Sequence, residues 1–344
     1  MSGIETVLVT GGSGFVGGHC IVKLLEKGYS VRTTIRSLSK KEKVLDMLKN
    51  GGITSFDRIS FCEADLTEDA NWHDAVKDCE YVLHVASPIL FTIPKDENEM
   101  IRPAVDGTLR VLKAARDGGV RRVVMTSNFG AVGYSHKDPH TPITEKEWTD
   151  PNEKHLTAYN KSKVLAERAA WDFVNSHGKG LELVTINPTA IYGPALCKDM
   201  SVGFELLKKI LDGSMRAIPQ LSMNVIDVRD VADLHIRAMT SPKAKGQRFL
   251  ALAGGEISLP EIANFLRARP EAERYNISNM ILPNWVAYFG GLFNQQLKTL
   301  ASMLKTSRNA SNEKAKTILD WEPIATNEEA IIASVESMLN FEIL

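Results

Sequence analysis

Tyr159 and Lys163 stand four residues apart, near the start of a segment with helical character. Residues four apart on a helix share one face, so the phenol and the ammonium can converge on one point. A free tyrosine has a pKa of about 10 and is a poor acid–base group at neutral pH. A nearby ammonium favours the phenolate and lowers that pKa. The pair predicts proton transfer at a substrate oxygen, with Tyr159 as the acid–base group and Lys163 as its partner.

Two further polar residues, Ser127 and Asn128, follow the apolar run Val123–Thr126. If that run is a strand of a parallel sheet, the two residues lie at its carboxyl end, where such sheets bind ligands. A carbonyl that gains a hydride needs a hydrogen-bond donor for its developing negative charge. Both side chains have a hydrogen-bond donor, and either could instead fix the turn. Because neighbouring residues on a strand point to opposite faces, only one of them would face the ligand. Both residues stay candidates at this point.

A glycine-rich turn, GGSGFVG at 11–17, follows the first apolar run and opens a helical segment. Without side chains, Gly11 and Gly14 let the backbone turn sharply and approach a pyrophosphate, and Gly17 lets the helix pack closely on the strand. The spacing is GxxGxxG and differs from the usual GxGxxG, but its place after the first strand predicts a dinucleotide site. The cofactor contacts expected in this turn are Gly11, Gly14, Phe15, Val16 and Gly17.

The end of the second predicted strand indicates which dinucleotide binds. NAD-binding chains place an acidic residue about 20 positions after the glycines, to accept a hydrogen bond from the ribose 2′-hydroxyl. Here Arg36 holds that position, with Lys40, Lys41 and Lys43 close by. A guanidinium can bind a 2′-phosphate with two hydrogen bonds, whereas a carboxylate would repel it. We therefore expect NADPH, while each lysine on its own is read as part of a solvated helix start.

Asp65 and Leu66 follow the third predicted strand, where the adenine would lie. The Asp65 carboxylate can accept a hydrogen bond from the adenine amino group. It can equally cap a helix that begins near Thr67. Both readings stay open.

Strand-length apolar runs alternate with helical segments through the first half of the chain. The predicted strands are Val7–Thr10, Tyr29–Ile35, Ile59–Cys62, Tyr81–Val85, Val123–Thr126, Leu183–Asn187 and Arg248–Ala253. The predicted helices between or after them are Gly14–Lys27, Lys41–Lys49, Trp72–Lys77, Ala104–Asp117, Ala158–Ser176, Val202–Leu211 and Val231–Met239. This rhythm predicts an α/β fold with a Rossmann-type, doubly wound parallel sheet covered by helices on both faces.

After Pro188 the alternation breaks, and from Ser258 onward the chain reads as mostly helical. We expect an NADP-binding domain of residues 1–188 with 224–255. A smaller, mostly helical substrate-binding domain is expected from residues 189–223 with 256–344.

Several motifs together resemble the extended short-chain dehydrogenase/reductases, in particular the group of dihydroflavonol reductases, cinnamoyl-CoA reductases and yeast-type methylglyoxal/carbonyl reductases. They are VTGGSGFVG, the string ending at Arg36, EADL, LHVASP, RVVMTSN, YNKSK, INPTAIYGP and IDVRDVADLH, with EKAKTILDWEP near the C-terminus. The main match runs from about Thr6 to His235.

The resemblance implies roles for matching positions. The glycines would hold the pyrophosphate, Arg36 with Lys43 the 2′-phosphate, and Asp65 with Leu66 the adenine. Tyr159 would donate the proton in reduction, and Lys163 would hold the nicotinamide ribose. The positions that would lie along the nicotinamide are Ala86, Ser87, Pro188 and Ile191.

Two positions depart from the family pattern. Asn128 stands where the family has a serine that assists the carbonyl; an amide can donate a hydrogen bond there but cannot relay a proton. We prefer Asn128 as the donor and keep Ser127 as the alternative. Gly133 stands where plant dihydroflavonol reductases carry an asparagine that contacts a flavonoid ring, which argues against a flavonoid substrate.

The composition excludes several classes of partner. A net charge of −1 offers no electrostatic reason for binding nucleic acid or an anionic membrane. The longest apolar run, 281–293, falls short of the about 20 residues that cross a bilayer. Four scattered cysteines form no metal-ligand cluster, and with no signal peptide in view they favour a reduced, cytoplasmic protein. We expect no bound metal, and a monomer or homodimer.

These patterns together predict NADPH-dependent reduction of an aldehyde or ketone by hydride transfer. A first alternative is a sugar-nucleotide epimerase or dehydratase that keeps NAD bound, against which Arg36 argues. A second is a non-catalytic NADP sensor with a protein partner, against which Tyr159 and Lys163 argue.

Overall fold

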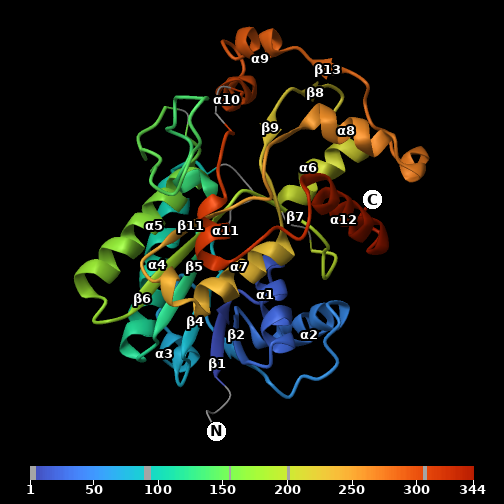
Figure 1. The fold of residues 1–344 in the computed structure, drawn as a ribbon. Helices are drawn as coiled ribbons and strands as arrows, with labels where there is room; N and C mark the ends of the chain where they lie inside the picture. Colours follow the sequence, from blue (N-terminus) through green and yellow to red (C-terminus); the bar gives the residue numbers. More distant parts are fainter. Residues whose placement is uncertain (1–4, 89–93, 155, 200–201, 305–307) are drawn as a thin grey trace.

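The computed structural model describes residues 5–88, 94–154, 156–199, 202–304 and 308–344 (Figure 1). Its centre is a parallel sheet with the strand order β11-β6-β5-β4-β1-β2-β3. The strands are β1 (Thr6–Thr10), β2 (Ser30–Ile35), β3 (Ile59–Glu63), β4 (Tyr81–His84), β5 (Arg122–Thr126), β6 (Glu182–Pro188) and β11 (Arg248–Ala251). The chain winds outward in both directions from the β1–β4 boundary, which confirms the predicted doubly wound, Rossmann-type fold.

Helices cover both faces of this sheet (Figure 1). One face packs on α1 (Phe15–Glu26), α2 (Lys41–Asn50), α7 (Val228–Thr240) and α11 (Glu313–Leu319). The other face packs on α3 (Trp72–Val76), α4 (Asn98–Asp117) and α5 (Ala158–His177). Strand residues alternate between the two apolar clusters: Val7 and Val9 face the first, and Leu8 between them faces the second. Burial on both faces explains why these strands read as continuous apolar runs.

A third apolar cluster lies outside the sheet and joins segments from both ends of the second half of the chain. Its helices are α6 (Val202–Leu211), α8 (Leu259–Arg267) and α12 (Asn327–Asn340). Beyond it, α9 (Asn284–Gly290) and α10 (Gln295–Met303) lie at the end of the molecule opposite the N-terminus (Figure 1).

Short strand pairs and single turns of 3₁₀-helix complete the fold. The parallel pairs are β7 (Ala190–Tyr192) with β10 (Val225–Asp227) and β13 (Ile281–Leu282) with β8 (Ile218–Pro219). The antiparallel pair is β12 (Ile257–Ser258) with β9 (Ser222–Met223). The 3₁₀ turns are η1 (Leu38–Lys40), η2 (Phe129–Ala131), η3 (Pro242–Ala244) and η4 (Pro270–Arg274).

The predicted elements of the sheet all recur, with one clear difference in length. The sequence predicts a helix from Ala104, directly after a proline, but α4 begins at Asn98 and contains Pro103. Pro103 is the sixth residue of α4, so its missing N–H forfeits a single helical hydrogen bond. The apolar stripe that includes Met100, Ile101 and Ala104 is buried and outweighs that loss.

The division into two domains stays a prediction, and two observations bear on it. Trp321 and Ala315, from the proposed second domain, belong to the apolar cluster beneath the sheet. The C-terminal α12 packs against β7 and β10. The last 30 or so residues therefore reach across the boundary that the sequence suggests.

Candidate active site

The glycine-rich turn leaves space only for backbone. Gly11 has a φ of +74°, and a Cβ built on it would lie 3.0 Å from Cα of Ala86. A Cβ on Gly17 would lie 2.3 Å from the Gly11 carbonyl oxygen, so α1 begins in direct contact with the turn. Gly12, which the sequence analysis did not single out, is as constrained, because its Cβ would meet Thr33 Oγ1 at 2.1 Å. Tight backbone packing of this kind at a helix start suits a pyrophosphate, whose binding here stays a prediction.

Thr10 joins the two central strands at the point where the winding reverses. Its hydroxyl accepts a hydrogen bond from the Ala86 N–H (3.0 Å) and lies 3.0 Å from Nδ1 of His84. Gly11 N–H donates to Thr34 Oγ1 (3.2 Å) on the neighbouring strand. The sequence did not predict a role for Thr10 or Thr34. The only hint was that Thr10 directly precedes the glycines. Burial lowers the pKa of His84 to about 3, so it is a neutral core residue.

Arg36 is exposed at the end of β2, and among the described residues it has no ion-pair partner. Its charge helps to lower the pKa of Asp65, after the hydrogen bonds from Thr67. Lys43 on α2 forms an ion pair with Asp199. A 2′-phosphate would thus find Arg36 available, whereas Lys43 would first have to leave Asp199.

Asp65 caps the local turn: its Oδ1 accepts from Thr67 N–H (2.8 Å) and from Thr67 Oγ1 (2.7 Å). No helix starts at Thr67 in the described chain, since α3 begins only at Trp72. Leu66 packs against α4: a Cβ added to Gly107 of that helix would lie 2.9 Å from the Cβ of Leu66. Asp65 therefore caps a turn and not a helix at Thr67, so the predicted helix cap is wrong, and an adenine contact stays a prediction.

The first two turns of α5 carry the predicted acid–base pair. Thr157 caps this helix by accepting from Asn160 N–H (3.2 Å), which sets Tyr159 and Lys163 one turn apart on one face. Lys163 Nζ lies 5.4 Å from the centroid of the Tyr159 ring and donates to Ser87 Oγ (2.8 Å). Ser87 follows β4, so the predicted nicotinamide side and the predicted acid–base pair meet at one point.

The pKa values of this pair differ from the expectation. Burial and the neighbouring Tyr134 raise the pKa of Tyr159 to about 12. Burial lowers the pKa of Lys163 to about 8. The expectation of a phenol pKa lowered toward neutral is therefore wrong, because burial of Tyr159 outweighs the effect of the nearby ammonium. Tyr159 is a neutral phenol at pH 7, the form that can donate a proton.

Ser127 and Asn128 point to different partners. Ser127 is buried, and its hydroxyl donates to Glu167 Oε2. Asn128 caps η2: its Oδ1 accepts from Gly130 N–H (2.7 Å), and its amide nitrogen has no partner within the described chain. The geometry thus favours Asn128 as the donor to a carbonyl, though this role stays a prediction.

Glu167, missed in the sequence, is fully buried one turn after Lys163. Besides Ser127, it accepts hydrogen bonds from Asn187 Nδ2 (2.7 Å) and Thr185 Oγ1 (3.0 Å) on β6, and it pairs with Arg248 Nε on β11 (2.7 Å). The only hint in the sequence that Glu167 is buried and paired was its place on the apolar face of a predicted helix. This network joins α5 to β6, to β11 and to the residue that follows β5, and it positions the helix that carries Tyr159.

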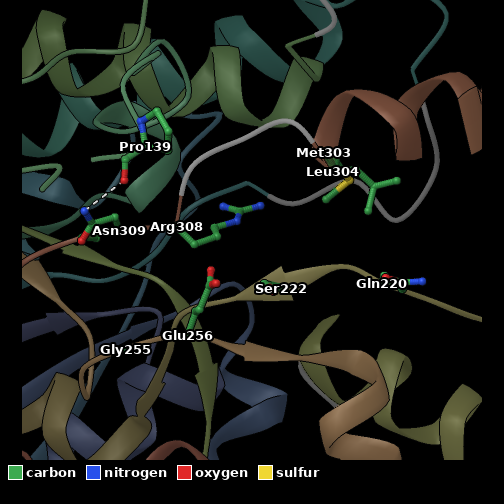
Figure 2. Close-up of a pocket in the computed structure, with 10 residues that line it drawn as sticks. Pro139, Gln220, Ser222, Gly255, Glu256, Met303, Leu304, Arg308 and Asn309 are labelled. Atoms are coloured by element: carbon green, nitrogen blue, oxygen red, sulfur yellow. Dashed lines mark hydrogen bonds between the residues drawn. The ribbon is translucent and has the colours of Figure 1, made fainter. Parts of the chain in front are cut away.

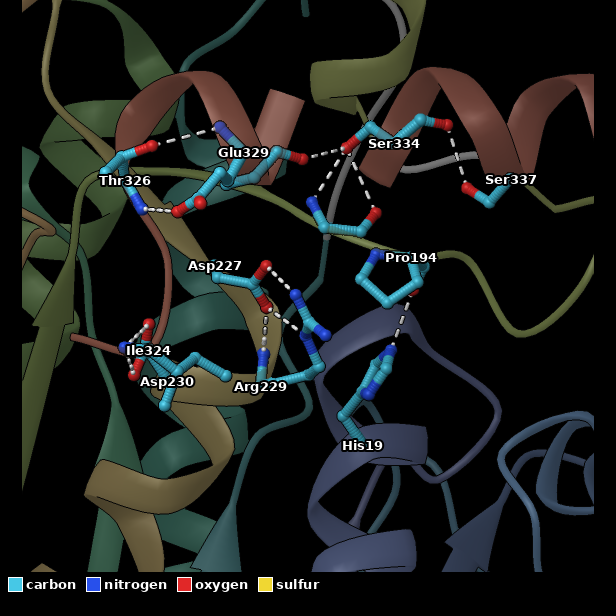
Figure 3. A network of polar contacts seen from close by, with 12 residues as sticks. His19, Pro194, Asp227, Arg229, Asp230, Ile324, Thr326, Glu329, Ser334 and Ser337 are labelled. Carbon is cyan, nitrogen blue, oxygen red and sulfur yellow. Dashed lines mark hydrogen bonds and ion pairs between the residues drawn. The ribbon is translucent and has the colours of Figure 1, made fainter. Parts of the chain in front are cut away.

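The segment after Pro188 is held between two helices (Figure 3). His19 on α1 bonds the Pro194 carbonyl oxygen (2.9 Å), and Ser334 on α12 accepts from Gly193 N–H (2.7 Å). Ile191, in β7, pairs with Ile226 of β10. Ile191, a predicted nicotinamide neighbour, therefore lies in this fixed segment, and Pro188, the other, is the last residue of β6.

Phe129, which directly follows Asn128, is 4% exposed and belongs to an apolar cluster with Leu250 and Leu252. A Cβ on Gly133 would lie 2.3 Å from its ring, so Gly133 accepts no larger residue without displacing Phe129. This contact explains the glycine at that position.

Within the described ranges, no group of three or more potential ligand side chains could hold a metal ion. No helix in the described part of the chain combines the length and apolar character needed to cross a bilayer.

Comparison with known proteins places this geometry in a family context. Residues 7–251 match the family described as the NAD dependent epimerase/dehydratase family. The chain is 36% identical to cinnamoyl-CoA reductase 1 of Petunia hybrida over 256 residues, 72% of each protein. It is 35% identical to dihydroflavonol 4-reductase of Zea mays, over 77% of this chain and 74% of that protein.

Among solved structures, the fold is similar to yeast methylglyoxal/isovaleraldehyde reductase Gre2 complexed with NADPH. The TM-score is 0.80 at 26% identity, and the alignment covers 98% of this chain and 99% of the other.

Proposed function

The chain belongs to the NAD dependent epimerase/dehydratase family, and from this membership and the site geometry we propose that it reduces an aldehyde or ketone to an alcohol with NADPH. The observation that carries the proposal is the meeting of Tyr159, Lys163 and Ser87 beside the glycine-rich turn. The reductases to which the chain is similar support it. A cytoplasmic location and a monomeric or homodimeric state belong to the same proposal.

The residues present fit NADPH. Three glycines leave room only for backbone at the predicted pyrophosphate cradle, and the exposed Arg36 suits a 2′-phosphate. When bound, the cofactor supplies a hydride to the carbonyl carbon. Lys163, already directed at Ser87, would hold the nicotinamide ribose. Ala86, Pro188 and Ile191 would flank the ring.

In this account Tyr159 donates its phenolic proton to the oxygen of the reduced carbonyl. An alkoxide is a stronger base than a phenolate, so a phenol with a pKa of about 12 still transfers its proton readily. The phenolate left behind is stabilised by the Lys163 ammonium over its ring. The Asn128 amide would donate a hydrogen bond to the oxygen as negative charge develops.

Steady-state assays with aliphatic, aromatic and diketone substrates test the proposal. We expect net oxidation of NADPH with at least one carbonyl, and weaker activity with NADH because Arg36 has no 2′-phosphate to bind. NADPH binding without turnover across the panel would contradict a reductase and point to the sensor alternative. Cofactor that is retained and recycled, with no net consumption, would point to the epimerase alternative.

A further inference from the structure

A cavity of about 470 Å³ is lined by Pro139, by Ser222 and Glu256, and by Met303, Leu304 and Arg308 (Figure 2). Met303 and Leu304 give it an apolar wall, and the charged residues that line it are Arg308 and Glu256. Figure 2 shows the Arg308 guanidinium and the Glu256 carboxylate pointing into the same space.

Arg308 connects this cavity to the catalytic residues. Its guanidinium carbon lies 5.5 Å from the ring centroid of Tyr134 and 5.9 Å from that of Phe129. Tyr134 is close enough to Tyr159 to influence its pKa, and Phe129 directly follows Asn128. One layer of aromatic rings thus separates the guanidinium from the proposed site of reduction.

The guanidinium is unpaired. Arg308 Nε is buried without a hydrogen-bond partner, and among the described residues no carboxylate lies within ion-pair distance of this side chain. A buried donor without a partner costs free energy, and an arginine presents a planar set of donors that matches a carboxylate. Glu256, at the exposed rim, does not fill that role.

The backbone around the arginine is fixed. Asn224, which is 3% exposed, donates from its amide nitrogen to the Arg308 carbonyl oxygen (2.8 Å) and to the Gly255 carbonyl oxygen (2.7 Å). Ile143 N–H donates to the Asn309 carbonyl oxygen (2.7 Å). One buried amide therefore joins two walls of the cavity and holds the backbone of Arg308 in place.

We propose that Arg308 binds a carboxylate carried by the carbonyl substrate, so that the enzyme prefers aldehydes or ketones with an apolar body and an acidic end. This inference rests on the proposed function and deepens it. In this proposal the apolar body lies against Met303 and Leu304, which line the cavity. The proposal requires the carbonyl end to pass the rings of Phe129 and Tyr134 to meet Tyr159. A hydrogen-bonded ion pair of this kind corresponds to about tenfold to hundredfold in affinity.

The test compares ω-carboxy aldehydes of increasing chain length with their methyl esters. At the best length, wild-type kcat/KM for the acid exceeds that for the ester by about tenfold or more. Arg308→Met brings this ratio to about one without lowering activity on the ester, and Arg308→Lys keeps part of the preference. Arg274→Met, which removes an exposed arginine outside the cavity, is the matched control and leaves the ratio unchanged.

Two further results decide the case. Glu256→Gln removes a competing negative charge and raises the preference for acids about twofold to fivefold. A wild-type preference for esters at every length, or a ratio that Arg308→Met leaves intact, overturns the role of Arg308 while the reductase proposal stands. If neither series is reduced, the reductase proposal fails, and calorimetric binding of the saturated ω-carboxylates to wild type and Arg308→Met still decides whether Arg308 binds them.

Discussion

At the scale of single residues, the site depends on which charges are already paired. Arg36 is exposed and free of ion pairs within the described chain, whereas Lys43 is bound to Asp199. The family resemblance gives both residues a role toward a 2′-phosphate. The structure makes them unequal, because Lys43 must exchange one anion for another.

This difference predicts unequal effects on cofactor choice. Arg36→Met raises KM for NADPH by about tenfold to hundredfold, the equivalent of a hydrogen bond to a charged group. KM for NADH stays nearly unchanged, because NADH has no 2′-phosphate. Lys43→Met has the smaller effect on NADPH. Steady-state kinetics with both cofactors measure this, and equal losses for NADPH and NADH after Arg36→Met would contradict it.

A second residue-scale prediction concerns pH. Burial lowers the pKa of Lys163 to about 8, so the ammonium is present below that pH and lost above it. The charged fraction falls from about one half at pH 8 to about one tenth at pH 9. Affinity for NADPH, measured by fluorescence titration, therefore declines as the pH rises through 8. Lys163→Met removes this inflection, and a flat wild-type profile from pH 7 to pH 9.5 would count against the role of Lys163.

At the scale of elements, the end of β5 separates two neighbouring side chains. Ser127 turns inward to Glu167, and Asn128 turns outward at the start of η2. The sequence alone leaves both as candidate donors, because strand alternation says that they point oppositely but not which one faces the ligand. The decisive partner, Glu167, lies 40 residues away and is found only in the folded chain.

Substitutions distinguish the two residues. Ser127→Ala leaves the buried Glu167 carboxylate short of one donor and lowers the free energy of unfolding by about 1–3 kcal/mol, with kcat little changed. Asn128→Asp keeps the acceptor for Gly130 but removes the amide donor, and kcat falls about a hundredfold or more. Urea unfolding and turnover are measured on both variants. Loss of turnover in Ser127→Ala with retention in Asn128→Asp would reverse the assignment.

At the scale of the whole molecule, the parallel sheet and its helices were predictable because strand-length apolar runs alternate with helical segments in the sequence. The segments of the second half that lie outside this sheet were harder to predict. Its strand pairs are two or three residues long, and its helices pack on segments far away in sequence. Trp321 illustrates the point: it is 1% exposed, packs beneath the sheet, and donates to Asp230 on α7 (3.2 Å).

This packing predicts that the C-terminal segment unfolds together with the sheet. Trp321→Ala removes a large buried side chain and lowers the free energy of unfolding by about 3–5 kcal/mol. Circular dichroism and the loss of NADPH binding then follow one transition at a lower urea concentration. Two separate transitions, with NADPH binding unaffected by the first, would show instead that the segment folds independently.

The central claim is that the Tyr159 phenol donates a proton beside a bound nicotinamide, and single-turnover reduction by Tyr159→Phe tests it most directly. With NADPH saturating, we expect binding close to that of wild type and a rate of carbonyl reduction at least about a hundredfold lower, since the proton donor alone is missing. A Tyr159→Phe enzyme that reduces the carbonyl at the wild-type rate would contradict the account.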